Sequence, residues 1–292
     1  MLGAIEAGGT KFVCGVGNKD GEIVDRISIQ TTTPEETLGK VFAYFKDKKI
    51  EALGIGSFGP IDPVLNSDTY GYITTTPKPH WSNYNLVGAL KSQFQVPISF
   101  DTDVNGAALG ESLWGAAQGV STCIYATVGT GIGVGAMIDG KLVHGLSHPE
   151  MGHIIVRRHG EDHFEGTCPY HGDCLEGLAS GPAIGKRWGV SADELPVDHP
   201  AWEMEAYYLA QALMNYVLIL SPERIVMGGG VMKQLQLFPL IRSKLAELLG
   251  GYVQHPALNT GLENYIVPPR LGDNAGLCGA LALSQMALES QG

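Results

Sequence analysis

The chain has 292 residues, of which 44% are hydrophobic and 17% are charged, and its formal net charge is −11. This composition can build a sizeable core and excludes a disordered chain. The acidic balance argues against a nucleic-acid binder, which usually carries a basic surface. No apolar stretch is long enough to predict a membrane-spanning helix, and residues 1–17 do not resemble a signal peptide. We therefore expect a cytoplasmic globular protein with neither nucleic acid nor a membrane as partner.

The first 100 residues predict strands that alternate with helices. Strands are expected over residues 2–7, 11–17, 22–31 and 52–57. A capping box at Thr33–Glu36 begins one helix. After a long loop rich in Thr and Pro, a short second helix is expected, with three apolar residues on one face: Leu86, Leu90 and Phe94. The alternation favours an α/β sheet with helices on its faces.

Residues 97–117 form an apolar strand that gives way to a helix rich in Ala, Leu and Glu, and two carboxylates lie at the changeover. These are Asp101 and Asp103, with Asn105 just beyond. Ligands of open α/β sheets bind at the carboxyl ends of strands, and a carboxylate held there can take a proton from a hydroxyl. On this stretch alone, capping of the helix by Asp103 or Asn105 is the more frequent role.

The second half begins near Thr122 and repeats the pattern of the first. Gly9-Thr10 aligns with Gly129-Thr130 at an offset of 120 residues. After an insertion over about 146–181, the remaining chain predicts further elements: helices over 200–220 and 237–249 and from 274, and strands over 224–227 and 265–267. Two similar halves imply a cleft between them, and we divide the chain into domains 1–117 and 118–292.

Three glycine-rich turns are candidates for contact with phosphate or another flat or charged ligand. They are Gly8-Gly9-Thr10-Lys11, Gly129-Thr130-Gly131-Ile132-Gly133 and Gly228-Gly229-Gly230. Glycine lets backbone N–H groups approach a phosphate closely, and threonine adds a hydroxyl donor. Neither of the first two matches the P-loop pattern, and each of them alone is more often an ordinary hairpin turn. The third alone is as typical of a flexible joint. The first two, as a matched pair in two halves, fit opposite sides of a nucleotide cleft.

The insertion carries a metal-binding pattern. Cys168, His171 and Cys174 have the spacing C-x2-H-x2-C in a loop rich in Gly and Pro, and thiolate and imidazole are zinc ligands. We choose His153 as the fourth ligand, with four alternatives: His144, His148, His159 and His163. Four protein ligands leave no open position, so such a zinc would brace the loop. The other three cysteines (Cys14, Cys123 and Cys278) lie in apolar patterns and are expected to be buried.

Two glutamates, Glu150 and Glu176, flank this loop. Facing a cleft, they could accept hydrogen bonds from the hydroxyls of a polyol. A single glutamate is more often a solvated surface charge, so this interpretation depends on the rest of the pattern.

Together these residues resemble the ROK family of sugar kinases, within the actin/hexokinase/Hsp70-like (ribonuclease H-like) fold. The resemblance covers essentially the whole chain and rests on five motifs: Glu6–Lys11, Asp101–Asn105, Gly129–Gly133, Glu150–His153 and Cys168–Glu176. It implies a two-domain α/β fold with an interdomain cleft and a zinc-braced loop insertion, in which the last helix packs back on the first domain.

The resemblance also implies an activity, ATP-dependent phosphorylation of a hexose. Asp103 would be the general base, and Glu150, His153, Glu176 and Gly59 would contact the sugar. The structural Zn2+ would be held by His153, Cys168, His171 and Cys174. ATP, accompanied by Mg2+, would be surrounded by Gly9, Thr10, Lys11, Thr130, Gly131, Pro182, Gly228, Gly229 and Gly230. Dimers are common in the family, and we expect a homodimer.

Three positions depart from the pattern of glucose-type relatives. Glu6 stands where many relatives have Asp, and Thr102 replaces an Asn that helps bind sugar in the glucose-type members. The zinc loop has His171 where glucokinase-like members have a pattern richer in cysteine. These features resemble the fructokinase branch, so D-fructose is the expected acceptor. Mannose, glucose and N-acetylated amino sugars remain alternatives. A sugar-responsive regulator would carry an N-terminal helix-turn-helix, which we do not expect because the first strand is predicted from Leu2.

Overall fold

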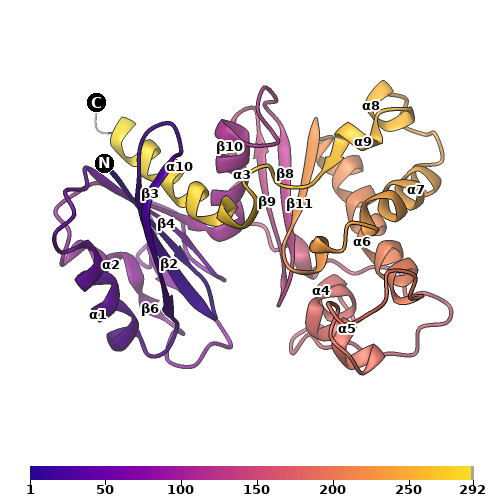
Figure 1. Cartoon of the computed structure of the whole chain (residues 1–292), viewed down its shortest axis with the longest axis horizontal. Helices are drawn as coiled ribbons and strands as arrows, with labels where there is room; N and C mark the ends of the chain where they lie inside the picture. The colour runs from indigo at the N-terminus through magenta and orange to yellow at the C-terminus, as the bar shows by residue number, and fades with distance from the viewer. Residues whose placement is uncertain (291–292) are drawn as a thin grey trace.

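The computed structural model describes residues 1–290, and strands and helices alternate along them (Figure 1). The elements of the first half are β1 (Leu2–Ala7), β2 (Lys11–Gly17), β3 (Ile23–Gln30), α1 (Pro34–Phe45), β4 (Ala52–Ser57), β5 (Tyr72–Ile73), β6 (Tyr84–Asn85), α2 (Leu86–Lys91), β7 (Ile98–Thr102) and α3 (Asp103–Trp114). The second predicted helix is shorter than expected, because α2 ends before Phe94. The Phe94 ring instead packs edge-on against Phe42 and Phe45 of α1.

The second half holds more helices than strands. Its elements are β8 (Cys123–Val128), β9 (Ile132–Ile138), β10 (Lys141–Leu142), α4 (Leu175–Ala179), α5 (Gly181–Trp188), α6 (Ala201–Leu220), β11 (Arg224–Gly228), α7 (Leu237–Leu249), α8 (Pro256–Asn259), α9 (Leu262–Tyr265), β12 (Ile266–Val267) and α10 (Ala275–Glu289). Single 3-10 turns cover Met151–His153, Val231–Lys233 and Gly272–Asn274. The insertion after β10 therefore contains little regular structure before α4.

Two five-stranded sheets share one topology. Their orders are β3-β2-β1-β4-β7 and β10-β9-β8-β11-β12. In each sheet the first three strands of the half are antiparallel, and the fourth and fifth join in parallel. The repeat predicted from a few aligned glycines is thus present in the strand order. Corresponding turns of the two halves lie at corresponding edges of their sheets.

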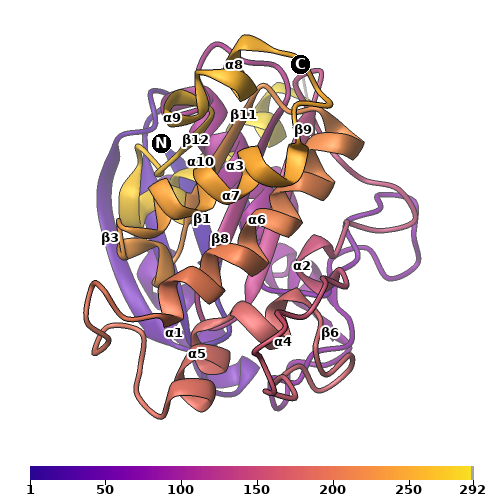
Figure 2. The ribbon, with the colours of Figure 1, turned by 90° about the vertical axis from the view of Figure 1, so that its right-hand side faces the viewer.

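Helices cover both sheets on their outer faces and fill the space between them. α1 and α2 lie outside the first sheet, α6 and α7 lie side by side outside the second, and α3 and α10 lie in between (Figures 1 and 2). α10 packs on β1, β4 and α3, so the end of the chain returns to the first sheet. A division into domains 1–117 and 118–292 would fall between α3 and β8, and it stays a prediction.

Glycine allows the two central helices to touch. A Cβ placed on Gly279 of α10 would lie 2.2 Å from the carbonyl carbon of Gly106 in α3. No side chain fits at such a contact, so the backbones of α3 and α10 pack directly against each other. The approach fixes α3, and with it the turn that precedes α3, relative to the first sheet.

The buried residues form separate cores under each sheet and between the two. Cys14, Cys123 and Cys278 are buried, as predicted. Throughout residues 1–290, no helix combines the length and apolar character needed to cross a membrane.

Candidate active site

The turn from β7 to α3 positions the first candidate, Asp103. The hydroxyl of Thr102 accepts the Asn105 N–H at 3.1 Å and thereby caps the helix. The alternative that Asp103 or Asn105 is the cap is therefore wrong, because the threonine between the strand and the helix already fills that position. Asp103 Oδ1 accepts the Val104 N–H at 2.9 Å, and among residues 1–290 its second oxygen has no protein hydrogen-bond partner. One carboxylate oxygen remains available for a ligand.

Two further carboxyl groups, Glu6 and Glu150, lie within electrostatic reach of Asp103. Burial raises the pKa of Asp103 to about 6. Burial, followed by the charge of Asp103, raises the pKa of Glu6 to about 7, and Lys11 opposes that shift. Loss of hydration, followed by the charges of Glu176 and Asp103, raises the pKa of Glu150 to about 7. A carboxylate with a pKa near neutrality is suited to proton transfer.

Asp101, two residues earlier, has a different environment from Asp103. Its Oδ1 accepts the Thr102 N–H and the Asn105 side-chain amide, each at 2.8 Å. Its Oδ2 lies 2.8 Å from His144 Nε2 of the second half. Asn105 in turn accepts the Ala136 N–H of β9 at 3.3 Å. Both oxygens of Asp101 are therefore occupied, and the residue joins the two halves beside Asp103.

The second glycine turn is supported by the insertion. Glu176 Oε2 accepts the Ile132 N–H at 2.9 Å, and Gly181 N donates to Gly129 O at 2.8 Å. The latter bond places Gly181, the first residue of α5 and the neighbour of Pro182, against the second glycine turn. A Cβ on Gly129 would lie 3.7 Å from Gly230 N, so the third glycine turn, Gly228–Gly230, meets the second.

The first glycine turn is more open than the second. Gly8 N donates to Lys11 O at 3.0 Å and closes the turn between β1 and β2. Thr31, which directly follows β3, donates its hydroxyl to Gly8 O at 2.7 Å and holds the turn. Thr10 and Lys11 are exposed. Their hydroxyl and ammonium groups are thus accessible to a ligand.

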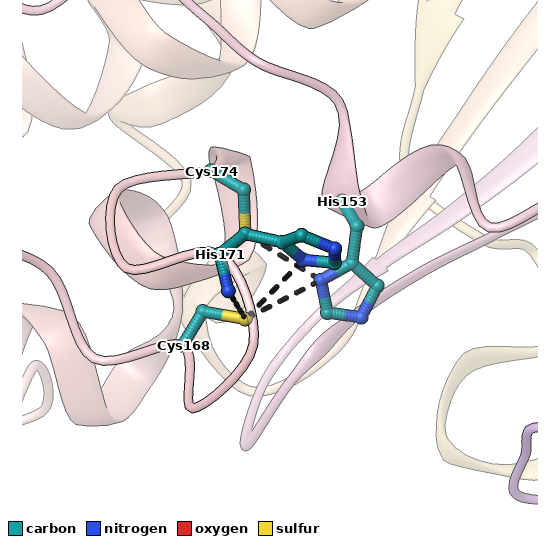
Figure 3. A group of neighbouring side chains, drawn as sticks. All are labelled: His153, Cys168, His171 and Cys174. Atoms are coloured by element: carbon teal, nitrogen blue, oxygen red, sulfur yellow. Dashed lines mark hydrogen bonds between the residues drawn. The ribbon is translucent and has the colours of Figure 1, made fainter. Parts of the chain in front are cut away.

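The structure brings His153, Cys168, His171 and Cys174 together, with their ligand atoms within 4.8 Å of one another (Figure 3). His153 Nδ1 lies 3.4 Å from Cys174 Sγ and 3.7 Å from Cys168 Sγ, and His171 Nδ1 lies 3.6 Å from Cys168 Sγ. A thiolate and an imidazole nitrogen on one tetrahedral zinc stand about 3.6 Å apart. The donor types and their spacing fit a closed, four-coordinate zinc site.

Comparison with known proteins places the chain in a family. The ROK family model matches residues 2–287. The chain belongs to the ROK family. A fructokinase of Pediococcus pentosaceus is 50% identical over 99% of this chain and 99% of its own length, and a fructokinase of Zymomonas mobilis is 48% identical over 98% and 97%. The crystal structure of a ROK glucokinase from Streptomyces griseus, in complex with glucose and AMPPNP, superposes with a TM-score of 0.78 at 25% identity over 98% of this chain and 99% of that one.

These comparisons confirm the expected family and its actin/hexokinase-like fold. The structure, for its part, separates the histidines that the sequence offered as metal ligands. In this ROK protein His153 lies in the Cys/His cluster. His144 instead contacts Asp101, and His148 accepts the Ile61 N–H at 3.0 Å. The His159 ring packs on Tyr207, and His163 is exposed.

Sequence reasoning missed two features of the site. One is the pair of Asp101 and His144, and the other is the contact between His148 and the loop that contains Gly59, whose would-be Cβ lies 3.4 Å from the His148 ring. The histidines were visible only as possible metal ligands. No local pattern could have found their partners, because these lie 43 and 87 residues away along the chain.

Proposed function

We propose that this ROK protein is an ATP-dependent hexose kinase whose preferred acceptor is D-fructose. The observation that carries the proposal is Asp103, a half-buried carboxylate directly after β7 with a raised pKa and one oxygen that has no hydrogen-bond partner among the described residues. In the proposed reaction Asp103 takes the proton of the sugar 6-hydroxyl as the oxygen bonds to the γ-phosphorus of ATP. The bond from that phosphorus to the bridging oxygen breaks, and ADP leaves with fructose 6-phosphate as the other product.

Phosphoryl transfer depends mainly on positioning and charge stabilisation, because its transition state is loose. We assign the phosphates to the two glycine–threonine turns, through Gly9, Thr10 and Lys11 in the first half and Thr130 and Gly131 in the second. Pro182 and Gly228–Gly230 meet the second turn and would face the rest of ATP. Mg2+ bound with the nucleotide would neutralise phosphate charge.

The sugar would lie against Asp103, Gly59, Glu150, His153 and Glu176. Two observations support fructose over glucose. Fructokinases match nearly the full chain at 50% and 48% identity, whereas the glucokinase structure matches at 25%. In addition, Thr102 stands where glucose-type relatives are expected to carry an Asn, so no side-chain amide is present at that position to bind the sugar. Kinases of mannose, glucose or an N-acetylated amino sugar are the alternatives.

We further propose that His153, Cys168, His171 and Cys174 bind a structural Zn2+. His153 Nε2 lies 3.9 Å from Glu176 Oε1, so a metal on Nδ1 would also orient the imidazole toward the proposed sugar site. Metal analysis of protein purified without chelator should give about one zinc per chain. Protein free of zinc that retains full sugar affinity would contradict this assignment.

The localisation and assembly that we propose are a cytoplasmic homodimer. Light scattering coupled to gel filtration checks the assembly directly. A monomer at micromolar concentration would rule out the dimer without affecting the kinase proposal.

The deciding experiment is an ADP-release assay with Mg-ATP and a panel of fructose, mannose, glucose and N-acetylmannosamine. We expect the highest kcat/KM with fructose. A different best sugar would keep the role of Asp103 and discard the fructose assignment. No turnover with any sugar, in folded protein that contains zinc, would overturn the kinase proposal.

A further inference from the structure

A segment of the second half crosses to the first half beside the proposed sugar site. This bridging segment, residues 143–150, follows β10 and precedes the 3-10 turn that begins at Met151. It is attached to its own half where Val143 N donates to Ala136 O of β9 at 3.0 Å. Side chains of the segment then contact the first half at two separate places, and a histidine makes the contact at each.

At the first place His148 holds the loop that follows β4. The Ile61 N–H donates to His148 Nε2 at 3.0 Å, and the Ser147 hydroxyl donates to Ile61 O at 3.1 Å. Ile61 is 1% exposed and the His148 side chain 5% exposed. Because the backbone groups of Ile61 are buried, water cannot readily replace these side chains as hydrogen-bond partners.

The bond from Ile61 also decides which nitrogen of His148 carries the proton. A backbone N–H can only donate, so Nε2 is unprotonated and the proton of the neutral ring is on Nδ1. Loss of hydration lowers the pKa of His148, which favours this neutral form. The Nδ1 atom faces Glu150 Oε1 at 3.7 Å, and the ring lies against Gly59. One imidazole therefore touches two positions that we assign to the sugar.

At the second place His144 contacts the turn that carries Asp103. Its Nε2 lies 2.8 Å from Asp101 Oδ2, and Asp101 is 3% exposed. Since Thr102 and Asn105 occupy the other oxygen of Asp101, His144 is the partner that connects this buried carboxylate to the bridging segment. The two histidines thus contact the first half at the loop that contains Gly59 and at the turn that carries Asp103.

We propose that His148 and His144 are positioning residues. His148 joins the two halves through Ile61 and sets the positions of Glu150 and Gly59 for the acceptor sugar. His144 positions the turn that carries Asp103. This inference rests on the proposed hexose kinase activity. It predicts that the bond made by each Nε2 atom matters more than the imidazole as such. A side chain that places a suitable polar atom at the same point should therefore substitute for each histidine.

Two matched amide variants of His148 test this. The glutamine side chain of H148Q can place its oxygen near the position of Nε2, whereas the shorter amide of H148N ends near the position of Nδ1 and cannot reach the Ile61 N–H. We expect H148N to raise the KM and the dissociation constant for fructose about tenfold, with kcat and the KM for ATP within about twofold of the wild type. H148Q should stay within about threefold in every constant.

The readouts include two that do not depend on turnover. Calorimetry with fructose measures sugar affinity, and hydrogen exchange at the Ile61 amide should speed up in H148N but not in H148Q.

At the second place, H144N should lower kcat about tenfold with little change in the KM for fructose. H144Q, whose amide can still donate to Asp101, should restore kcat. If H148N does not fold, Ser147→Ala removes only the bond to Ile61 O and should raise the fructose KM about threefold.

The possible failures can be told apart. A wild-type protein that neither binds nor phosphorylates any hexose overturns the proposed function and this inference with it. An active wild type whose H148N and H148Q variants share its constants overturns the inference alone. Three other outcomes would also overturn it, because they indicate a general structural role. One is an equal loss of affinity for fructose and ATP in H148N, and another is an equal loss in H148N and H148Q. The third, where Ser147→Ala is needed, is an unchanged fructose KM in that variant.

Discussion

The two halves place an aspartate at corresponding strand–helix turns, and the two aspartates have opposite surroundings. In the first half β7 leads into α3 at Asp103, where burial raises the carboxyl pKa to about 6. In the second half β12 leads into α10 through the turn Gly272–Asn274. There Asp273 is 81% exposed and lies 2.9 Å from Lys233, whose hydrogen bond lowers the Asp273 pKa. One carboxyl is a candidate base, and the other is an ordinary surface charge.

The difference comes from what covers each turn. The first turn is enclosed by the second half, since His144 contacts Asp101 and Ala136 N donates to Asn105. The second turn has α10 beyond it, which packs back on the first sheet and leaves Asp273 in solvent. A shared topology therefore places the carboxyl group, and the packing of the other half decides its chemistry.

The largest test of this comparison is a pair of matched substitutions. Asp103→Asn should keep the fold and sugar binding while kcat falls about 10²–10⁴-fold, because the amide cannot accept the hydroxyl proton. Asp273→Asn should leave kcat within about threefold. Steady-state kinetics with fructose and calorimetric sugar binding check both variants, and near-normal kcat in Asp103→Asn would remove the base from the proposal.

The pH dependence gives a smaller, graded effect. Below a pH of about 6 Asp103 is protonated and cannot act as a base, so kcat/KM should fall about tenfold per pH unit there. The same raised pKa means that ionising Asp103 lowers the stability of the fold as the pH rises through about 6. A profile measured from pH 5 to 8 at constant ionic strength checks the activity. A kcat/KM that stays constant down to pH 5 would show that the pKa of Asp103 is not raised in the enzyme.

The smallest expected effect concerns the cap that frees Asp103. Thr102→Ala removes the bond from the Asn105 N–H and should lower the free energy of unfolding by about 1 kcal/mol. It should also reduce kcat severalfold, because the first turn of α3 carries Asp103. Thr33→Ala is the control, since Thr33 caps α1 through the Glu36 N–H at 3.4 Å. Urea unfolding and kinetics of both variants should show similar stability losses, with a loss of activity in Thr102→Ala alone.

Much of the fold was predictable because its signals are local. The expected helix at 237–249 matches α7, and the expected strands at 2–7, 11–17 and 52–57 match β1, β2 and β4. The boundary errors lie where packing decides, as at α2, which stops at Lys91 while Phe94 packs on α1. Periodicity records which residues face a core, and it does not record where the backbone leaves the helix.

The candidate site was predictable in part for the same reason. The spacing of Cys168, His171 and Cys174 lies within one loop, and the structure brings His153 beside them. The cap of α3 could not be assigned from the sequence, because Thr102, Asp103 and Asn105 are all capping residue types and only the backbone conformation selects one. The roles of His144 and His148 could not be predicted, since both partners lie in the other half.

The sequence by itself determined where the strands, glycine turns and Cys/His loop lie, because propensity, glycine conformational freedom and ligand spacing act over a few residues. Only the tertiary structure decided which aspartate is shielded from solvent and which buried carboxylate has a histidine partner. It also decided which main-chain N–H is held across the two halves. The physical reason is that hydration and charge depend on every group packed nearby, and around Asp103 those groups come from both halves of the chain.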